Sequence, residues 1–159
     1  MRKLRLYLDT SVLSHLFADD TPEKMGETVR MWDRIVSGGH EIFISYVTLD
    51  EMRRCPGDKR NKMFQKLGEI GYKIIEKSDE ISRLGSAYIE NKALPAKSQA
   101  DSEHIACAVV ANCDFIVSWN FRHLVNPKTD RGVRLVNAMK LYKEIAIVSP
   151  SNLAYLEDE

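Results

Sequence analysis

Short apolar runs alternate with longer amphipathic segments along this chain, and that alternation limits the possible folds more than any other feature. Apolar runs this short, bounded by polar or turn residues, are typical of buried strands. The expected strands are Leu4–Leu8, Ile42–Ile44, Tyr72–Ile75, Phe115–Val117 and Ile145–Val148. Strands that are separated by helices pair into a parallel sheet with helices on both faces. The sequence therefore predicts an α/β fold.

The helical segments are predicted from their apolar spacing and from the residues at their ends. Thr21 and Pro22 are typical of a helix cap and a first helical position, and Gly38 with Gly39 ends that helix. Thr48 and Ser78 are expected to cap two later helices, and residues 126–130 are expected to form a loop. Further helices are expected over residues 11–17, 59–67, 98–112 and 131–142, with a last short helix from Pro150.

Composition narrows the class of protein. A chain of 159 residues suits one domain, expected over residues 1–159. The 23 basic and 23 acidic residues balance, so binding to nucleic acid would depend on local basic patches. Three cysteines without paired spacing argue against a disulfide framework or a zinc site, and favour a reducing, cytoplasmic compartment. No apolar run is long enough for a membrane span.

Four oxygen-bearing side chains follow predicted strands or open predicted helices. Asp9 directly follows the first strand, where side chains of an α/β sheet point into the ligand-binding crevice. Glu51 and Asp101 are each expected in the first turn of a helix, and Asn120 follows the strand Phe115–Val117. The first strand often neighbours the strand after the chain reverses direction, so we expect Asp9 and Asn120 to meet.

Carboxylates gathered in one cleft repel one another unless a cation compensates them. Oxygen ligands suit hard cations, so Mg²⁺ or Mn²⁺ is the expected ion. An ion held in this way polarises a phosphodiester and activates water for in-line attack.

Taken singly, these residues have simpler explanations. Asp9 could cap the helix that starts at Thr10, and Glu51 or Asp101 could serve only to stabilise a helix end. His104 lies on an apolar helix, where a histidine is more often a hydrogen-bonded core residue than a ligand. The hypothesis of a metal site therefore depends on the acids being brought together by the fold.

Four segments in this order and spacing resemble the PIN domain, as found in VapC-like toxins of toxin–antitoxin pairs. They are residues 7–13, 45–51, 101–108 and 114–121, and the resemblance extends to residues 145–150. It implies a three-layer α/β/α fold with a central five-stranded parallel sheet. It also implies an Mg²⁺- or Mn²⁺-dependent endoribonuclease acting on RNA, a protein antitoxin as partner and a homodimer.

The resemblance assigns roles to individual residues. Asp9, Glu51 and Asp101 correspond to the first three acids of the family and would bind the metal. Asn120 stands at the fourth catalytic position, where the family usually has Asp, so the site has three formal carboxylate charges and weaker metal binding is expected. Supporting hydrogen bonds are expected from Thr10 and Ser118. Arg53 and Arg54 follow Glu51 closely and Arg122 follows Asn120, so these positions could bring the arginines to RNA phosphates near the crevice.

Two other interpretations stay open. The first is a PIN-like binding module with little activity that acts through RNA or a protein partner, which Asn120 and the zero net charge favour. The second is another α/β enzyme, such as a haloacid-dehalogenase-like phosphatase or a receiver domain. The phosphatase needs a second Asp where this chain has Ser11, and the receiver needs paired acids after the first strand, so this interpretation ranks third.

Overall fold

The computed structural model describes residues 3–157, with side chains up to Leu153. Five strands form one sheet in the order β3-β2-β1-β4-β5, and every neighbouring pair is parallel. The strands are β1 (Leu4–Leu8), β2 (His40–Ser45), β3 (Lys73–Ile75), β4 (Phe115–Val117) and β5 (Ala146–Val148). The predicted α/β fold with a five-stranded parallel sheet is confirmed.

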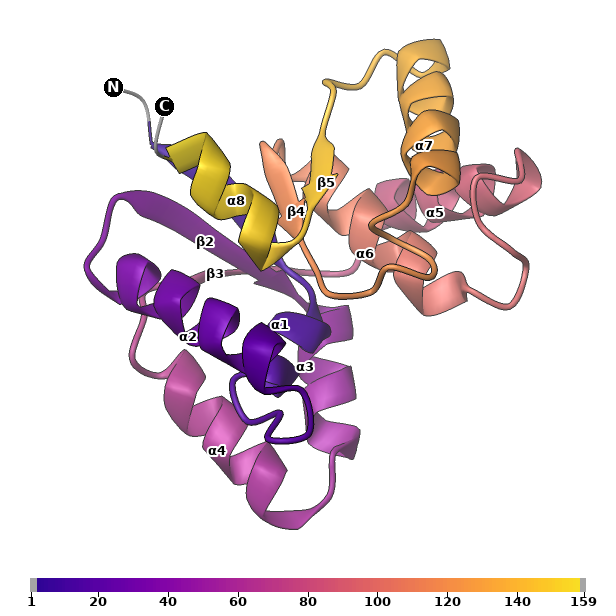
Figure 1. The fold of residues 1–159 in the computed structure, drawn as a ribbon. Coiled ribbons are helices and arrows are strands. Elements are labelled where there is room, and N and C mark those ends of the chain that lie inside the picture. Colours follow the sequence, from indigo (N-terminus) through magenta and orange to yellow (C-terminus); the bar gives the residue numbers. More distant parts are fainter. Residues whose placement is uncertain (1–2, 158–159) are drawn as a thin grey trace.

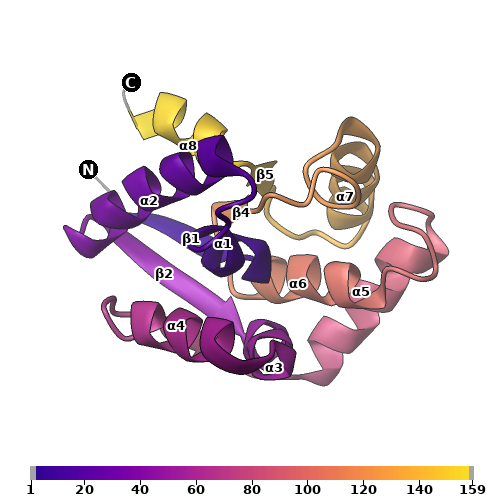
Figure 2. The same ribbon diagram turned by 60° about the horizontal axis from the view of Figure 1, so that its bottom comes forward.

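Helices cover both faces of the sheet, so the molecule has three layers (Figures 1 and 2). Helices α1, α2, α4 and α8 pack on one face, and α5, α6 and α7 pack on the other. The helices are α1 (Thr10–His15), α2 (Pro22–Val36), α3 (Tyr46–Arg54), α4 (Gly57–Leu67), α5 (Asp79–Glu90), α6 (Gln99–Val110), α7 (Pro127–Met139) and α8 (Pro150–Glu157). Within residues 3–157, no helix combines the length and the apolar character that crossing a membrane requires.

Alternation along β1 supplies both halves of the core. Leu6 and Leu8 are fully buried against the α1, α2, α4 and α8 side, whereas Tyr7 is fully buried on the opposite face. This is the pattern expected of a strand in the middle of a doubly covered sheet. Burial on both faces fixes the direction of β1 and hence the position of the residue that follows it, Asp9.

Two helix starts differ from the sequence prediction. Helix α3 is capped by Ser45, whose hydroxyl accepts from the Val47 N–H, and Thr48 is the reciprocal partner three residues later. Helix α7 begins at Pro127, inside the predicted loop, because the Asn126 side chain accepts from the Thr129 N–H. Both errors arise where several residues with capping side chains follow one another.

The remaining boundaries agree to within a few residues. Thr21 precedes α2 with Pro22 in the first position, although its side chain makes no capping hydrogen bond. The Ser78 hydroxyl accepts from the Ile81 N–H at the start of α5, as predicted.

Strand order fixes the position of the functional crevice. The connections lead outward from β1 to β2 and β3, and then return to β4 on the other side of β1. The sheet therefore changes direction between β1 and β4, and ligands of open α/β sheets bind at the carboxyl ends of the strands beside such a point.

Candidate metal centre at the carboxyl edge of the sheet

Asp9 lies at the switch point between β1 and β4. Its backbone N–H donates to the Val117 carbonyl at 3.1 Å, and the residue is 5% exposed. Its side chain does not cap α1. Instead Oδ2 accepts from the hydroxyls of Ser11 and Ser118, both at 2.7 Å. The simple explanation of Asp9 as a helix cap therefore fails, and its carboxylate is held in the crevice.

Glu51 comes to the same place from α3. Because α3 begins at Tyr46, Glu51 lies in the second turn and not in the predicted first turn, so helix-end stabilisation does not explain it. Its Oε1 accepts from the Thr10 hydroxyl at 2.9 Å and from His104 Nε2 at 2.5 Å.

His104 is the site residue whose position sequence reasoning missed. It is fully buried and hydrogen-bonded, as expected of a core histidine, but its partners are site residues. Besides Glu51, its Nε2 lies 3.3 Å from Asp9 Oδ1, and its Nδ1 lies 2.6 Å from the Tyr7 hydroxyl. The available signal was its spacing from Asp101, because residues three apart share one face of a helix.

Asp101 lies in the first turn of α6, as predicted. Burial raises its pKa, and the negative charge of Asp9 raises it further. Hydrogen bonds connect the two acids, since Asn120 donates to Asp101 and to the Ser118 hydroxyl, which in turn donates to Asp9. Asp9, Glu51 and His104 bring their ligand atoms within 4.8 Å of one another, and Asp101 lies outside this triad.

Asn120 joins the site through Asp101. Its Nδ2 donates to Asp101 Oδ1 at 3.3 Å, and its Oδ1 accepts from the His123 N–H at 3.0 Å. Only an oxygen can accept from a backbone N–H, so the amide orientation is fixed, with the donor toward the carboxylate. Asn120 stabilises the turn after β4 and offers the acid cluster a hydrogen bond.

His104 offsets part of the negative charge of the cluster. Burial lowers the pKa of His104, but the carboxylates of Asp9, Glu51 and Asp101 outweigh burial and raise it. Burial raises the pKa of Glu51, but the hydrogen bond and charge of His104 outweigh that effect and lower it.

Each of the three carboxylates has one oxygen that the protein holds by hydrogen bonds. Among the side chains that the structure describes, the other oxygens, Asp9 Oδ1, Glu51 Oε2 and Asp101 Oδ2, accept no hydrogen bond, although Asp9 Oδ1 lies 3.3 Å from His104 Nε2. Carboxylate oxygens of this kind are the ligands that Mg²⁺ and Mn²⁺ prefer. The donor set fits a hard divalent cation.

The three predicted RNA-binding arginines are all exposed. Arg53 pairs with Asp50 at 3.3 Å, whereas Arg54 lines a pocket that also contains Glu51. Arg122 lies in the turn after Asn120, where its carbonyl accepts from the Asn126 side chain.

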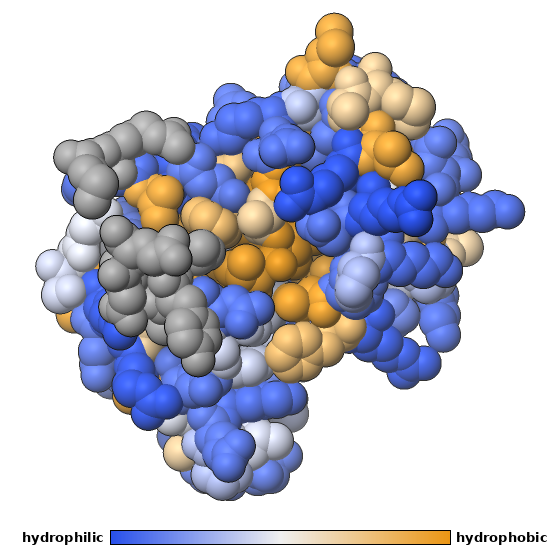
Figure 3. All heavy atoms as spheres, turned by 45° about the horizontal axis from the view of Figure 1, so that its top comes forward, coloured by the Kyte–Doolittle hydropathy of each residue, from blue (hydrophilic) through white to orange (hydrophobic). Residues whose placement is uncertain are grey.

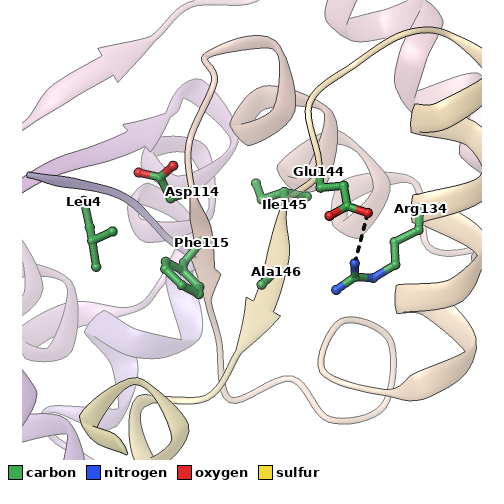
Figure 4. Close-up of a pocket in the computed structure, with 7 residues that line it drawn as sticks. All are labelled: Leu4, Asp114, Phe115, Arg134, Glu144, Ile145 and Ala146. Carbon is green, nitrogen blue, oxygen red and sulfur yellow. Dashed lines mark ion pairs between the residues drawn. The ribbon is translucent and has the colours of Figure 1, made fainter. Parts of the chain in front are cut away.

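A separate pocket lies at the opposite edge, where β1, β4 and β5 begin (Figure 4). Its charged groups are engaged with one another, since Arg134 lies 3.5 Å from Glu144, and Asp114 lies 2.9 Å from Lys143. Figure 3 shows the molecule with the top of Figure 1 turned toward the viewer. Apolar side chains are exposed in the middle of this face. Among the described residues, the group that could hold a metal lies around Asp9 and not at the edge where these strands begin.

Fold and site together define an α/β/α protein with an acidic centre at the switch point of its sheet. The chain belongs to the PIN domain family, which matches residues 5–122. No curated protein matches the chain significantly. Among solved structures, it resembles the crystal structure of VapBC2 from Rickettsia felis bound to a DNA fragment from their promoter. The TM-score is 0.56 at 15% identity, covering 92% of this chain and 98% of that chain, so this likeness shows the fold. The predicted membership of the PIN domain family is confirmed.

Proposed function

We propose that this protein is an Mg²⁺- or Mn²⁺-dependent endoribonuclease, the toxin of a toxin–antitoxin pair, with one PIN-like domain over residues 1–159. The observation that supports the activity is the convergence of Asp9, Glu51 and Asp101 at one crevice, each with an oxygen that accepts no hydrogen bond among the described residues. The bound metal supplies charge stabilisation to the phosphodiester and lowers the pKa of a water molecule.

The site residues divide into ligands and supports. Asp9 and Asp101 would ligate the metal directly, and Glu51 would ligate it or hold a water in its coordination shell. Ser118 and Thr10 orient Asp9 and Glu51 through the hydrogen bonds described above. Asn120 adds no charge and holds Asp101 through its amide. His104 keeps Glu51 oriented through Nε2, and the Tyr7 hydroxyl fixes the ring through Nδ1.

The partners follow from the family and from the structural neighbour. That neighbour is a VapBC complex on promoter DNA, which supports a protein antitoxin as partner of this chain. We further propose a homodimer in the cytoplasm, with RNA phosphates bound by Arg53, Arg54 and Arg122.

The test combines metal binding with RNA cleavage. Mn²⁺ is titrated against the wild type, Asp9→Asn and Asp101→Asn, and cleavage of a single-stranded RNA is followed in parallel. Asp19→Asn, in an exposed acid of the loop before α2, is the matched control. We expect both site variants to lose Mn²⁺ binding and cleavage while unfolding at a temperature near that of the control. Equal cleavage by the wild type and Asp9→Asn would exclude the site.

A second candidate is a PIN-like binding module, which one observation favours. The oxygen of Asn120 already accepts from the His123 N–H, and the fourth family position contributes no carboxylate charge to hold a metal. This function predicts partner binding that survives Asp9→Asn and Asp101→Asn, together with no cleavage by the wild type. A pull-down in which both variants lose the partner would contradict it.

A further inference from the structure

A pocket of about 380 Å³ opens directly beside the acid cluster, with Glu51 in its lining. It lies between α3, the segment that joins β3 to α5, and the start of α6. Sites for small ligands have volumes of about 300–1,000 Å³. A molecule bound at the acid cluster can therefore extend into this pocket without any change in the fold.

The acids that line the pocket already have partners. Asp50 pairs with Arg53 at 3.3 Å, and Glu103 accepts from the Tyr46 hydroxyl at 2.6 Å. Glu51 is held by Thr10 and His104, as described above. Each of these carboxylates keeps a second oxygen that accepts no hydrogen bond in the described part of the chain.

The cations of the pocket have no such partners. Arg54 ends α3, and Lys77 lies between β3 and α5, and both are exposed. Neither forms a hydrogen bond or an ion pair with the side chains that the structure describes, although the charge of Arg54 contributes to lowering the pKa of Glu51. Unpaired basic side chains beside a metal centre are suited to bind phosphate.

We propose that this pocket is a subsite for one ribonucleotide of the RNA substrate. Arg54 and Lys77 bind the phosphate next to the bond that is cleaved. The second oxygens of Asp50 and Glu103 accept hydrogen bonds from sugar hydroxyls, which DNA lacks at the 2′ position. This inference rests on the proposed function, because it places the substrate of the same site.

The pocket also explains why two adjacent arginines differ. Arg53 and Arg54 are both exposed on the last turn of α3, but only Arg54 lines the pocket, and Arg53 is engaged by Asp50. Arg54 is therefore the arginine that contacts the phosphate in this pocket, whereas Arg53 lies outside the pocket and pairs with Asp50. This separates two residues that sequence reasoning treated alike.

The experiment measures binding of a fluorescein-labelled RNA heptamer by anisotropy in EDTA, over 25–200 mM salt. The variants are the wild type, Arg54→Ala/Lys77→Ala and a matched control, Arg83→Ala/Lys140→Ala. The control also removes two positive charges that line a pocket, of about 420 Å³, beside Tyr142. Each phosphate contact on a single strand contributes about 0.7 to the slope of log K against log salt.

Because Arg54 and Lys77 bind the same phosphate, we expect the slope to fall by about 0.7 in Arg54→Ala/Lys77→Ala and to stay unchanged in the control. We also expect the DNA heptamer of the same sequence to bind more weakly than RNA to the wild type, with a smaller difference after Asp50→Asn/Glu103→Gln. Equal slopes for the two double variants, no RNA binding by the wild type at 25 mM salt, or equal binding of DNA and RNA would overturn the proposal.

Cleavage in Mn²⁺ separates this proposal from the proposed function. If the wild type binds through the pocket in EDTA but does not cleave with metal, the nuclease function fails and the binding subsite stands. If the wild type cleaves and Arg54→Ala/Lys77→Ala has the KM of the control, the subsite fails and the nuclease function stands.

Discussion

Replacing Asn120 by Asp tests how strongly repulsion between carboxylates lowers the stability of the protein when no metal is bound. The Asn120 amide donates to Asp101 Oδ1 at 3.3 Å. In Asn120→Asp the oxygen toward His123 is retained, but the donor becomes a carboxylate oxygen that faces another carboxylate. Two unit charges 3.3 Å apart repel by about 5 kcal/mol at an effective dielectric constant of about 20.

Only part of that repulsion is expected in the measured stability. Both residues are partly exposed, so water, small movements and proton uptake reduce the effect. We expect the free energy of unfolding of the metal-free variant to fall by about 1–2 kcal/mol at pH 7. A divalent ion removes the repulsion, so the same free energy should reappear as metal affinity, about 5- to 30-fold tighter Mn²⁺ binding than in the wild type.

The assay is urea unfolding in EDTA and in Mn²⁺, together with calorimetric titration of Mn²⁺. Asn61→Asp is the control. Asn61 is exposed on α4, and its substitution adds the same charge away from the acid cluster. The reasoning is refuted if Asn120→Asp binds Mn²⁺ no more tightly than the wild type, or if Asn61→Asp loses the same stability in EDTA.

Two further predictions concern packing and thiol chemistry. A Cβ on Gly132 would lie 2.6 Å from the Cβ of Ala93 and 2.7 Å from its Cα. Gly132→Ala should therefore lower the free energy of unfolding, measured in urea, by about 1–3 kcal/mol. An unchanged unfolding midpoint would contradict this. Burial raises the pKa of Cys107 to about 11 and that of Cys113 to about 12, so these thiols should stay unreactive toward an aromatic disulfide at pH 8 and react only on unfolding. One fast equivalent, from Cys55, is expected in the native protein and should disappear in Cys55→Ser.

The fold could be predicted because its signals are local. Each strand is a short apolar run. Because both faces of β1 are buried, successive positions of this strand, Leu6, Tyr7 and Leu8, are all apolar or aromatic. The position of Asp9 follows directly, since a side chain that ends a central parallel strand has to lie at the carboxyl edge of the sheet. Asp101 was placed correctly for a similar reason, because one helix start determines it.

Helix starts were less predictable where several polar residues compete. Between β2 and α3 both Ser45 and Thr48 can cap, and the structure uses them as reciprocal partners. At α7 the pair Asn126 and Pro127 is the same kind of signal as Thr21 and Pro22, but the polar residues after it suggested a loop. The shift at α3 had a consequence for function, because it moved Glu51 from a helix end into the second turn.

The role of His104 could not be predicted from its surroundings in the sequence. Its hydrogen-bond partners, Tyr7 and Glu51, lie 97 and 53 residues away and belong to β1 and α3. A histidine among small apolar residues of a helix gives no local sign of this, and only the strand order brings the three side chains together. Long-range partners of a buried polar residue are therefore the part of the site that the sequence leaves open.

These contacts explain how acids can gather in a crevice before any metal binds. Asp9 has two hydroxyl donors, Glu51 has a hydroxyl and an imidazole, and Asp101 has an amide. The donors hold one oxygen of each carboxylate and offset part of the cost of burying it. Because the opposite oxygens stay without hydrogen bonds, a cation can bind without breaking the contacts that hold the site. These hydrogen bonds come from the protein itself, so we expect the acids to keep this arrangement without a metal and metal binding to change the structure little.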